Sequence, residues 1–182
     1  IVLIIAMLNQ YISWAMKHAF VPIYAGQLGA DSGDLGMLMS VWQGVFAALS
    51  YASPWITAQL GARWTVAAGM ALTTLATMLM PATSSLAVLT VLRGLHGAGT
   101  GLTMPVLMAG AVASVPGERR GAAMGFYQSI YAIGMVAGPA VSGVLADHLG
   151  LSATFGITGV IGLATLVTAA LTLPNRIGEA QG

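Results

Sequence analysis

The sequence predicts an all-α integral membrane protein whose chain crosses the bilayer six times. Of its 182 residues, 57% are hydrophobic and only 6% are charged, whereas a soluble domain carries about 25% charged residues. So few charges cannot cover a surface that faces water. The chain also divides into apolar stretches of the length that a membrane-spanning helix needs, about 20 residues.

Each predicted helix is an apolar stretch that ends in residues favouring turns. The six predicted spans are, in order, residues 1–26, 35–58, 64–81, 85–113, 121–146 and 152–173, with bounds good to about 2–4 residues. The breaks between them are Gly26–Asp34, Gln59–Arg63, Met80–Ser84, Val115–Arg120 and Asp147–Leu151, and Pro174 ends the last. The fourth span is the longest, and Pro105 is expected to kink it.

The basic residues outside the spans predict the orientation, because cytoplasmic loops carry an excess of Lys and Arg. They are Arg63, Arg119, Arg120 and Arg176, and they fall in alternate connections and in the tail. The other connections carry Asp31, Asp34, Asp147 and His148 instead. We therefore expect one domain, 1–182, in the cytoplasmic (inner or plasma) membrane, with both ends and the tail 174–182 on the cytoplasmic side.

Two cations lie in the middle of predicted spans. Lys17 is about ten residues from the outer end of the first span, a depth of roughly 15 Å, and Arg93 is at roughly 13 Å in the fourth. A charge at the bilayer centre costs about 2.5–3.5 kcal/mol on insertion scales. Neither stretch contains an acidic residue, so the two cations are predicted to have a use.

Three interpretations compete for these cations. Lys17 can extend its amine to an interface, and Arg93 can be structural, bonded to carbonyls or polar neighbours. In the third, which we favour, both line a wet cavity on the path of a substrate or of protons. The polar residues predicted to share that path are Asn9, which shares a helix face with Lys17, His96, one turn beyond Arg93, and Gln128 and Tyr131 of the fifth span.

Several classes of function are excluded or disfavoured. A net charge of +1 does not suit nucleic acid, which is bound by a concentrated basic patch. No metal-ligand cluster, nucleophile elbow or phosphate-binding loop is present in the sequence, so we expect no enzyme, metal or cofactor. No acidic residue lies within a predicted span, so the cations favour an anionic small-molecule substrate or require an acid from elsewhere.

The fifth predicted span is rich in small residues. Gly134 and Gly138 form a small-xxx-small pair, Pro139 follows directly, and Gly143 lies one turn further on. Helices in lipid associate where small residues let their backbones approach. The segment is therefore either a simple packing seam or a seam that also bends during gating.

The motifs resemble one six-helix half of a major facilitator superfamily transporter, of the drug:proton antiporter-like branch. Arg93-Gly-Leu-His96-Gly97-Ala-Gly99 is similar to the family's fourth-helix motif, with His96 in place of the usual Gln. Gly134 to Gly143 resembles its fifth-helix antiporter motif. The loop after the second span keeps only Gly61 and Arg63 of the family's loop motif, and a fuller copy, Gly143-Val-Leu-Ala-Asp147-His-Leu-Gly150, ends the fifth span.

The resemblance implies two inverted three-helix repeats, about 1–81 and 85–173, with the first and fourth spans lining a cavity. It implies a small-molecule substrate and a second six-helix half, supplied by the same chain, a second copy or a partner. The opening Asn9-Gln10-Tyr11 pattern favours a C-terminal half, and the Arg93 motif favours an N-terminal one. A membrane scaffold that retains the fold without transporting anything is the alternative.

Overall fold

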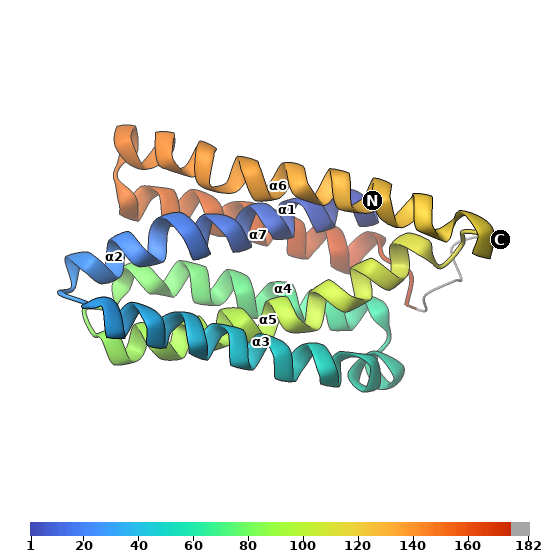
Figure 1. Ribbon diagram of the computed structural model, residues 1–182, viewed down its shortest axis with the longest axis horizontal. Coiled ribbons are helices and arrows are strands. Elements are labelled where there is room, and N and C mark those ends of the chain that lie inside the picture. Colours follow the sequence, from blue (N-terminus) through green and yellow to red (C-terminus); the bar gives the residue numbers. More distant parts are fainter. Residues whose placement is uncertain (176–182) are drawn as a thin grey trace.

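The computed structural model describes residues 1–175 of the chain, with the side chain of His18 left aside. Helices account for nearly all of this range, and the described residues contain no strand. In order they are α1 (Val2–Ala15), η1 (Met16–Phe20), α2 (Val21–Gln27), α3 (Ser32–Leu60), α4 (Ala62–Leu79), η2 (Met80–Ala82), α5 (Leu86–Val112), η3 (Gly117–Arg119), α6 (Arg120–Leu149) and α7 (Leu151–Thr172) (Figure 1). The predicted helices are found within three residues of their expected bounds. The predicted tail, 174–182, lies beyond the described residues after Asn175.

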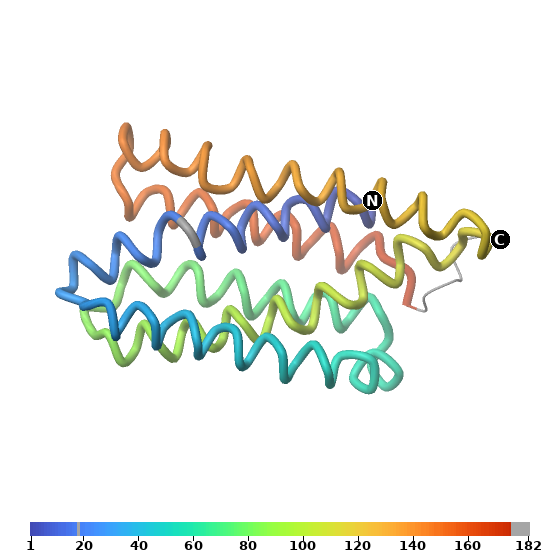
Figure 2. The backbone as a smooth tube through the Cα atoms, viewed as in Figure 1, coloured from blue at the N-terminus to red at the C-terminus, as the bar shows by residue number. Residues whose placement is uncertain are grey.

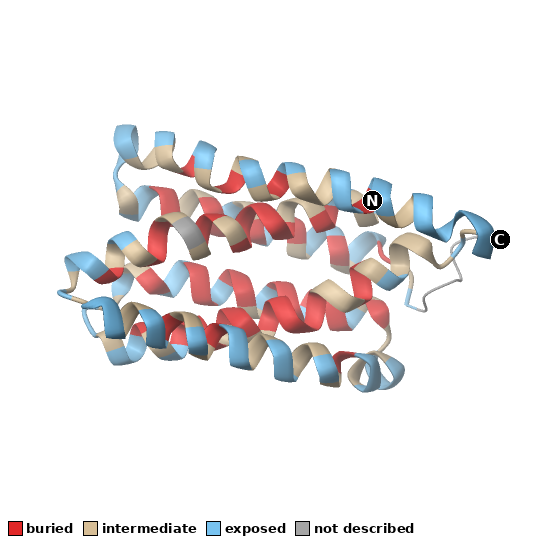
Figure 3. Cartoon of the chain, in the orientation of Figure 1, coloured by how far each residue is buried: buried red, intermediate tan, exposed pale blue. Residues whose placement is uncertain are grey.

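The helices form an elongated bundle in which the chain runs back and forth along the long axis (Figure 2). α5 packs against α3 and α4, α6 packs against α1, and α4 packs against α7. Burial is greatest on the facing sides of α1, α4 and α5 (Figure 3). The apolar windows of α3 and α6 are only 11% and 17% buried, so these two helices present most of their surface outward.

Four helical stretches in the described part of the chain are long and apolar enough to cross a membrane. They are Ser32–Leu60, Ala62–Ala82, Gly117–Leu149 and Leu151–Thr172. Large side chains such as Val91 and Leu171 are more than 70% exposed on the bundle, as contact with lipid permits. The molecule is thus an integral membrane protein. α5 is not among these four stretches, because its glycines, Arg93 and His96 lower its mean hydropathy. Six spans therefore remain a prediction.

The first predicted span is continuous but contains a π-helical turn. In η1 the backbone N–H of Val21 donates to the carbonyl of Met16, five residues back. Pro22 follows directly, has no N–H, and its ring would crowd the carbonyl four residues earlier. A widened turn relieves that crowding, and such turns are frequent at functional sites. Lys17 lies within this turn.

Two glycines join pairs of helices in the same conformation. Gly61 between α3 and α4 has φ 83° and ψ 159°, and Gly150 between α6 and α7 has φ 82° and ψ 160°. Residues with a Cβ rarely adopt a positive φ of this size. Each glycine lets one long helix end and the next begin with no further loop residue.

Glycines also set the closest helix crossings. A Cβ at Gly134 would overlap the carbonyl of Met7, and one at Gly138 would lie 2.6 Å from the carbonyl oxygen of Tyr11. α6 therefore meets α1 backbone to backbone. Gly143 has no neighbour within 4 Å of its Cβ position, so the described structure packs only the first two glycines of the motif.

Candidate functional site

Trp42 of α3 is the centre of the cationic region. The Nζ of Lys17 lies 5.0 Å from the centroid of its ring, and the Cζ of Arg93 lies 5.6 Å from it. Lys17 also lies 5.6 Å from the ring of Trp14. A cation over an aromatic face gains about 0.5–2 kcal/mol, with the larger values where water is excluded. One indole thus brings together two charges that are 76 positions apart in the sequence.

His96 is fixed by the same indole. The Nε1–H of Trp42 donates to Nδ1 of His96 at 3.0 Å, and His96 is fully buried. Because Nδ1 accepts, the neutral ring carries its proton on Nε2. That Nε2 is buried and has no hydrogen-bond partner, so His96 has one N–H donor without an acceptor.

Burial of Arg93 costs more free energy than burial of the neutral His96 ring. Its side chain is fully buried, its Nη2 lies 3.8 Å from the sulfur of Met39, and its Nε and Nη1 have no partner. An uncompensated buried charge costs about 3–5 kcal/mol when its partner is removed. One cation–π contact offsets only part of such a cost. The guanidinium is therefore poised to accept a negative group.

No described carboxylate bonds Arg93, since its Nε and Nη1 have no partner and its Nη2 contacts the sulfur of Met39. The acidic residues of the described range are Asp31, Asp34, Glu118 and Asp147. Asp31 and Asp34 cap the start of α3, Glu118 lies in η3, and Asp147 lies in the last turn of α6. All four are at helix ends, whereas Lys17 and Arg93 lie in helix interiors.

Two chambers of about 190 Å³ adjoin the cations. The first, the Lys17 chamber, is lined by Gln10, Ser13, Trp14, Lys17, Trp42, Gln43, Phe46, Thr100, Met104 and Tyr131. It lies between the first helix, α3, α5 and α6, and it mixes hydroxyl and amide groups with aromatic rings. Small-molecule sites combine apolar walls with a few polar groups in this way.

The second, the Arg93 chamber, is lined by Lys17, Val21, Pro22, Leu35, Leu38, Met39 and Arg93. Its walls are aliphatic except for the two cations. Lys17 lines both chambers, and Trp42 contacts both cations. The π-helical turn at Lys17 therefore adjoins both spaces.

The structure brings together some of the predicted path residues and not others. Lys17, Arg93 and His96 meet at Trp42, and Tyr131 lines the Lys17 chamber. Asn9 is buried with both amide atoms unpaired, outside the chamber linings. Gln128 is exposed on α6, also outside them.

The sequence interpretation did not include Trp42 and Gln10 among the path residues. Both lie in predicted spans, and Gln10 is on the stripe next to Lys17. The feature of the sequence that could have identified Trp42 is its position in mid-span, directly beside the polar Gln43. Only the pairing of α3 with α5 places that ring over Arg93, and this pairing is not readable from one sequence.

The loop motif lies at the other end of the bundle and binds the end of α7. The Nε–H of Arg63 donates to the carbonyl of Leu173 at 2.7 Å, and the N–H of Ala62 donates to the carbonyl of Asn175 at 2.7 Å. A basic side chain at a helix C-terminus also suits the helix dipole. By contrast, Gly150 has open space around its Cβ position and the nearby Asp147 is exposed.

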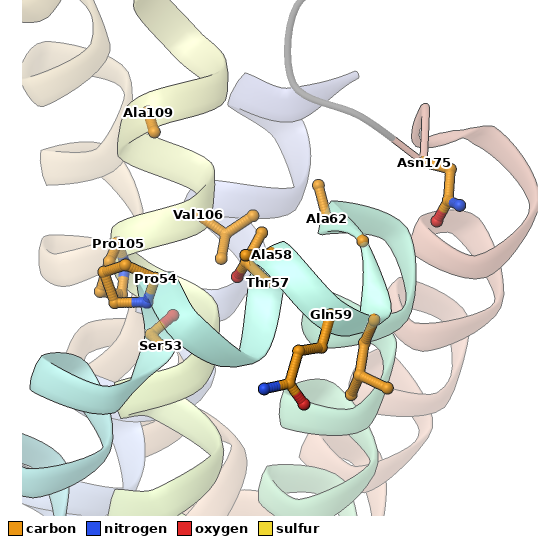
Figure 4. Close-up of a pocket in the computed structure, with 12 residues that line it drawn as sticks. Ser53, Pro54, Thr57, Ala58, Gln59, Ala62, Pro105, Val106, Ala109 and Asn175 are labelled. Carbon is orange, nitrogen blue, oxygen red and sulfur yellow. The ribbon is translucent and has the colours of Figure 1, made fainter.

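A pocket of about 550 Å³ lies at this same end (Figure 4), and neither Lys17 nor Arg93 is among its lining residues. Pro54 of α3 and Pro105 of α5 both lie on its wall, and Asn175 borders it. Thr57 lines it with a buried hydroxyl that has no partner. Its lining residues include no charged group, so it cannot bind a charged ligand by ion pairing as the two smaller chambers can.

Fold and site together define an α-helical integral membrane protein with a chamber beside Lys17 and a buried, incompletely partnered Arg93 between its helices. The comparisons with known proteins name the class more closely. The chain belongs to the Major Facilitator Superfamily, whose family model matches residues 2–181. The predicted family is therefore confirmed.

The relatives it matches are longer than this chain. It is 26% identical over 166 residues to the putative multidrug resistance protein MdtD of Escherichia coli O6:H1, covering 91% of this chain and 35% of the relative. It is 36% identical over 78 residues to the uncharacterized MFS-type transporter YuxJ of Bacillus subtilis, covering 43% of this chain and 20% of the relative. The chain thus spans about a third or less of these two relatives.

Solved structures share the fold. A peptide transporter POT crystallised with sulfate matches 97% of this chain and 38% of its own, with a TM-score of 0.80 and 20% identity. A POT family transporter in complex with a thioalcohol conjugated peptide matches 98% of this chain and 38% of its own, with a TM-score of 0.82 and 17% identity. At such identity the likeness concerns the fold alone.

Proposed function

We propose that the chain is one six-helix half of a secondary-active small-molecule transporter that works by alternating access. The observation that carries the proposal is the Lys17 chamber, a polar space between four helix elements with a cation in its wall. In this class of transporter, substrate binds near the midplane between halves. Lys17 is proposed to contact the solute or its counter-charge, and Tyr131 lines the same chamber.

The proposed topology has both ends in the cytoplasm and six spans. Val2, Ala62, Ala113 and Pro174 line one small pocket, so the start of the chain, the α3–α4 turn and the ends of α5 and α7 lie at the same end of the bundle. Arg63 belongs to this end. The start of α3 lies at the other end, where the described connections contain no Lys or Arg, as the rule of positive cytoplasmic loops requires.

Two inverted repeats, about 1–81 and 85–173, are proposed within the single domain 1–182. The equal backbone angles at Gly61 and Gly150 support this division. So do the lengths of α3 and α6, 29 and 30 residues. The pairing of α6 with the first helix repeats the pairing of α3 with α5, as an inverted repeat would.

A second six-helix half is proposed to complete the path. The low burial of α3 and α6 leaves the side of the Lys17 chamber open to such a partner. The share of the relatives that the chain covers also supports a larger assembly. Gln128, exposed on α6, then becomes available to the path from the partner side. Of the two opposed sequence signals, the Asn9-Gln10-Tyr11 pattern is given precedence over the Arg93 motif, and the chain is proposed as the C-terminal half.

Movement and coupling are assigned to two groups of residues. The Gly134–Gly138 crossing lets α6 shift against the first helix without side chains to unlock, and the part of the helix beyond it, from Pro139 to Gly143, is proposed to bend, since Gly143 has no packed neighbour. His96, fully buried with Nδ1 bonded to Trp42, is the proposed proton-sensitive neighbour, because a proton taken up at Nδ1 would break that hydrogen bond. Proton-coupled efflux follows if the α6 crossing and His96 both respond to the bound solute. A relative named as a putative multidrug resistance protein agrees with that direction.

The natural gene product, reconstituted in liposomes with an imposed pH gradient, tests the proposal. A panel of fluorescent efflux dyes and labelled small carboxylates supplies the probes. Movement of at least one of them above protein-free liposomes is expected, with dependence on the gradient. If none moves although the protein is folded and oriented, the scaffold alternative replaces transport.

A further inference from the structure

We propose that the Arg93 chamber is a binding site for a single anionic group, separate from the proposed path of the solute through the Lys17 chamber. The role of this site in transport rests on the proposed function, but binding of the anion can be measured without transport. Its site is built from α5, α3 and the π-helical turn of the first helix.

The charge of this chamber is one-sided. Arg93 is fully buried and has two unpartnered nitrogens, and Lys17 is the only other charged residue in the lining. The described acidic residues all lie at helix ends. A group with one negative charge between Arg93 and Lys17 would satisfy donors that the fold leaves open.

The size and the walls limit the ligand. A cavity of about 150 Å³ holds a benzene ring, whereas drug-sized ligands need pockets of about 300–1,000 Å³. The Arg93 chamber, at about 190 Å³, therefore fits one compact group. Its aliphatic residues, among them Leu35 and Leu38, suit a weakly hydrated halide or a short carboxylate with an apolar tail.

Trp42 gives the site its geometry and a means of communication. It faces both cations and also donates to His96. An anion that draws Lys17 toward Arg93 draws it away from the Lys17 chamber, which the same side chain lines. Occupancy of the Arg93 chamber is thus expected to change the charge that the solute meets in the Lys17 chamber.

Thermal unfolding of the natural gene product in lipid nanodiscs tests the site. Chloride, bromide and butyrate are titrated against gluconate at constant ionic strength. A saturable rise in Tm of about 2–4 °C is expected with at least one of the compact anions. A response to halides alone identifies a free inorganic anion as the ligand, and a response to butyrate alone identifies a carboxylate-bearing solute.

Three variants make the test specific. Arg93→Met removes the charge, and Leu35→Phe fills the chamber while keeping Arg93; both are expected to lose the saturable response. Arg119→Gln, at an exposed position in η3, is the matched control and should keep it. A Tm that does not depend on the anion, or a full response in folded Arg93→Met, overturns the inference. If the unaltered protein binds the anion but transports none of the panel of solutes, only the proposed function is refuted.

Discussion

The contact between α6 and the first helix yields the sharpest stability prediction, because one helix contains both the test position and its control. A Cβ at Gly134 would overlap the carbonyl of Met7 and lie 3.0 Å from the backbone nitrogen of Tyr11. Backbone atoms in a packed helix cannot turn aside as a side chain can. Gly143 in the same helix has nothing within 4 Å, so an added methyl group there meets no protein atom.

Gly134→Ala and Gly143→Ala gain the same helix propensity, about 1 kcal/mol, and this term cancels between them. The remaining difference is the cost of overpacking, about 1–3 kcal/mol, and contact with backbone places it in the upper part of that range. For about 2–3 kcal/mol we expect the Tm of Gly134→Ala to lie about 4–12 °C below that of Gly143→Ala. Tryptophan fluorescence during heating, in matched nanodiscs, measures both. Equal Tm values would refute the close crossing.

Three further outcomes follow from the contacts described above. Arg63→Met removes a charged hydrogen bond at the end of α7 and should lower the free energy of unfolding by about 1.5–3 kcal/mol; hydrogen exchange in the last turn of α7 should quicken, and unchanged exchange would contradict the contact. Gly61→Ala and Gly150→Ala both force a residue with a Cβ into a positive φ, at a cost of about 1–3 kcal/mol. The Cβ at position 61 would also collide with Asn175, whereas the one at position 150 meets nothing, so Gly61→Ala should have the lower Tm. Trp42→Phe keeps an aromatic ring but leaves Nδ1 of His96 without its donor, and we expect a loss of about 1–3 kcal/mol in chemical denaturation, whereas a neutral result would show that this hydrogen bond adds nothing.

Much of the fold was predictable because membrane helices are specified by composition over long stretches. Apolar runs and turn residues located each helix to within three residues. The π-helical turn at Lys17 was not predicted, since its cause is the local effect of Pro22 on backbone bonding. Two helices did not meet the criteria of length and hydropathy for a span. α5 contains glycines, Arg93 and His96, which lower its mean hydropathy, whereas α1 is apolar but ends after 14 residues at the π-helical turn.

The candidate site was predictable in its charges and not in its partners. The cost of a charge in an apolar run singled out Lys17 and Arg93 without any knowledge of packing. The sequence did not reveal that Trp42 faces both of them, since this depends on how α3 meets α5 in space. The positions of Asn9 and Gln128 depend in the same way on which helices lie beside them.

The central claim is that a cation in the Lys17 chamber contacts the transported solute or its counter-charge. Transport by the natural gene product in proteoliposomes, with a solute found in the panel above, tests it through Lys17→Met and Lys17→Arg. Loss of a charged contact worth at least 1.4 kcal/mol predicts a fall of about tenfold or more in initial rate for Lys17→Met, with partial retention in Lys17→Arg. Rates equal to those of the unaltered protein in Lys17→Met, at equal protein level, would contradict the account.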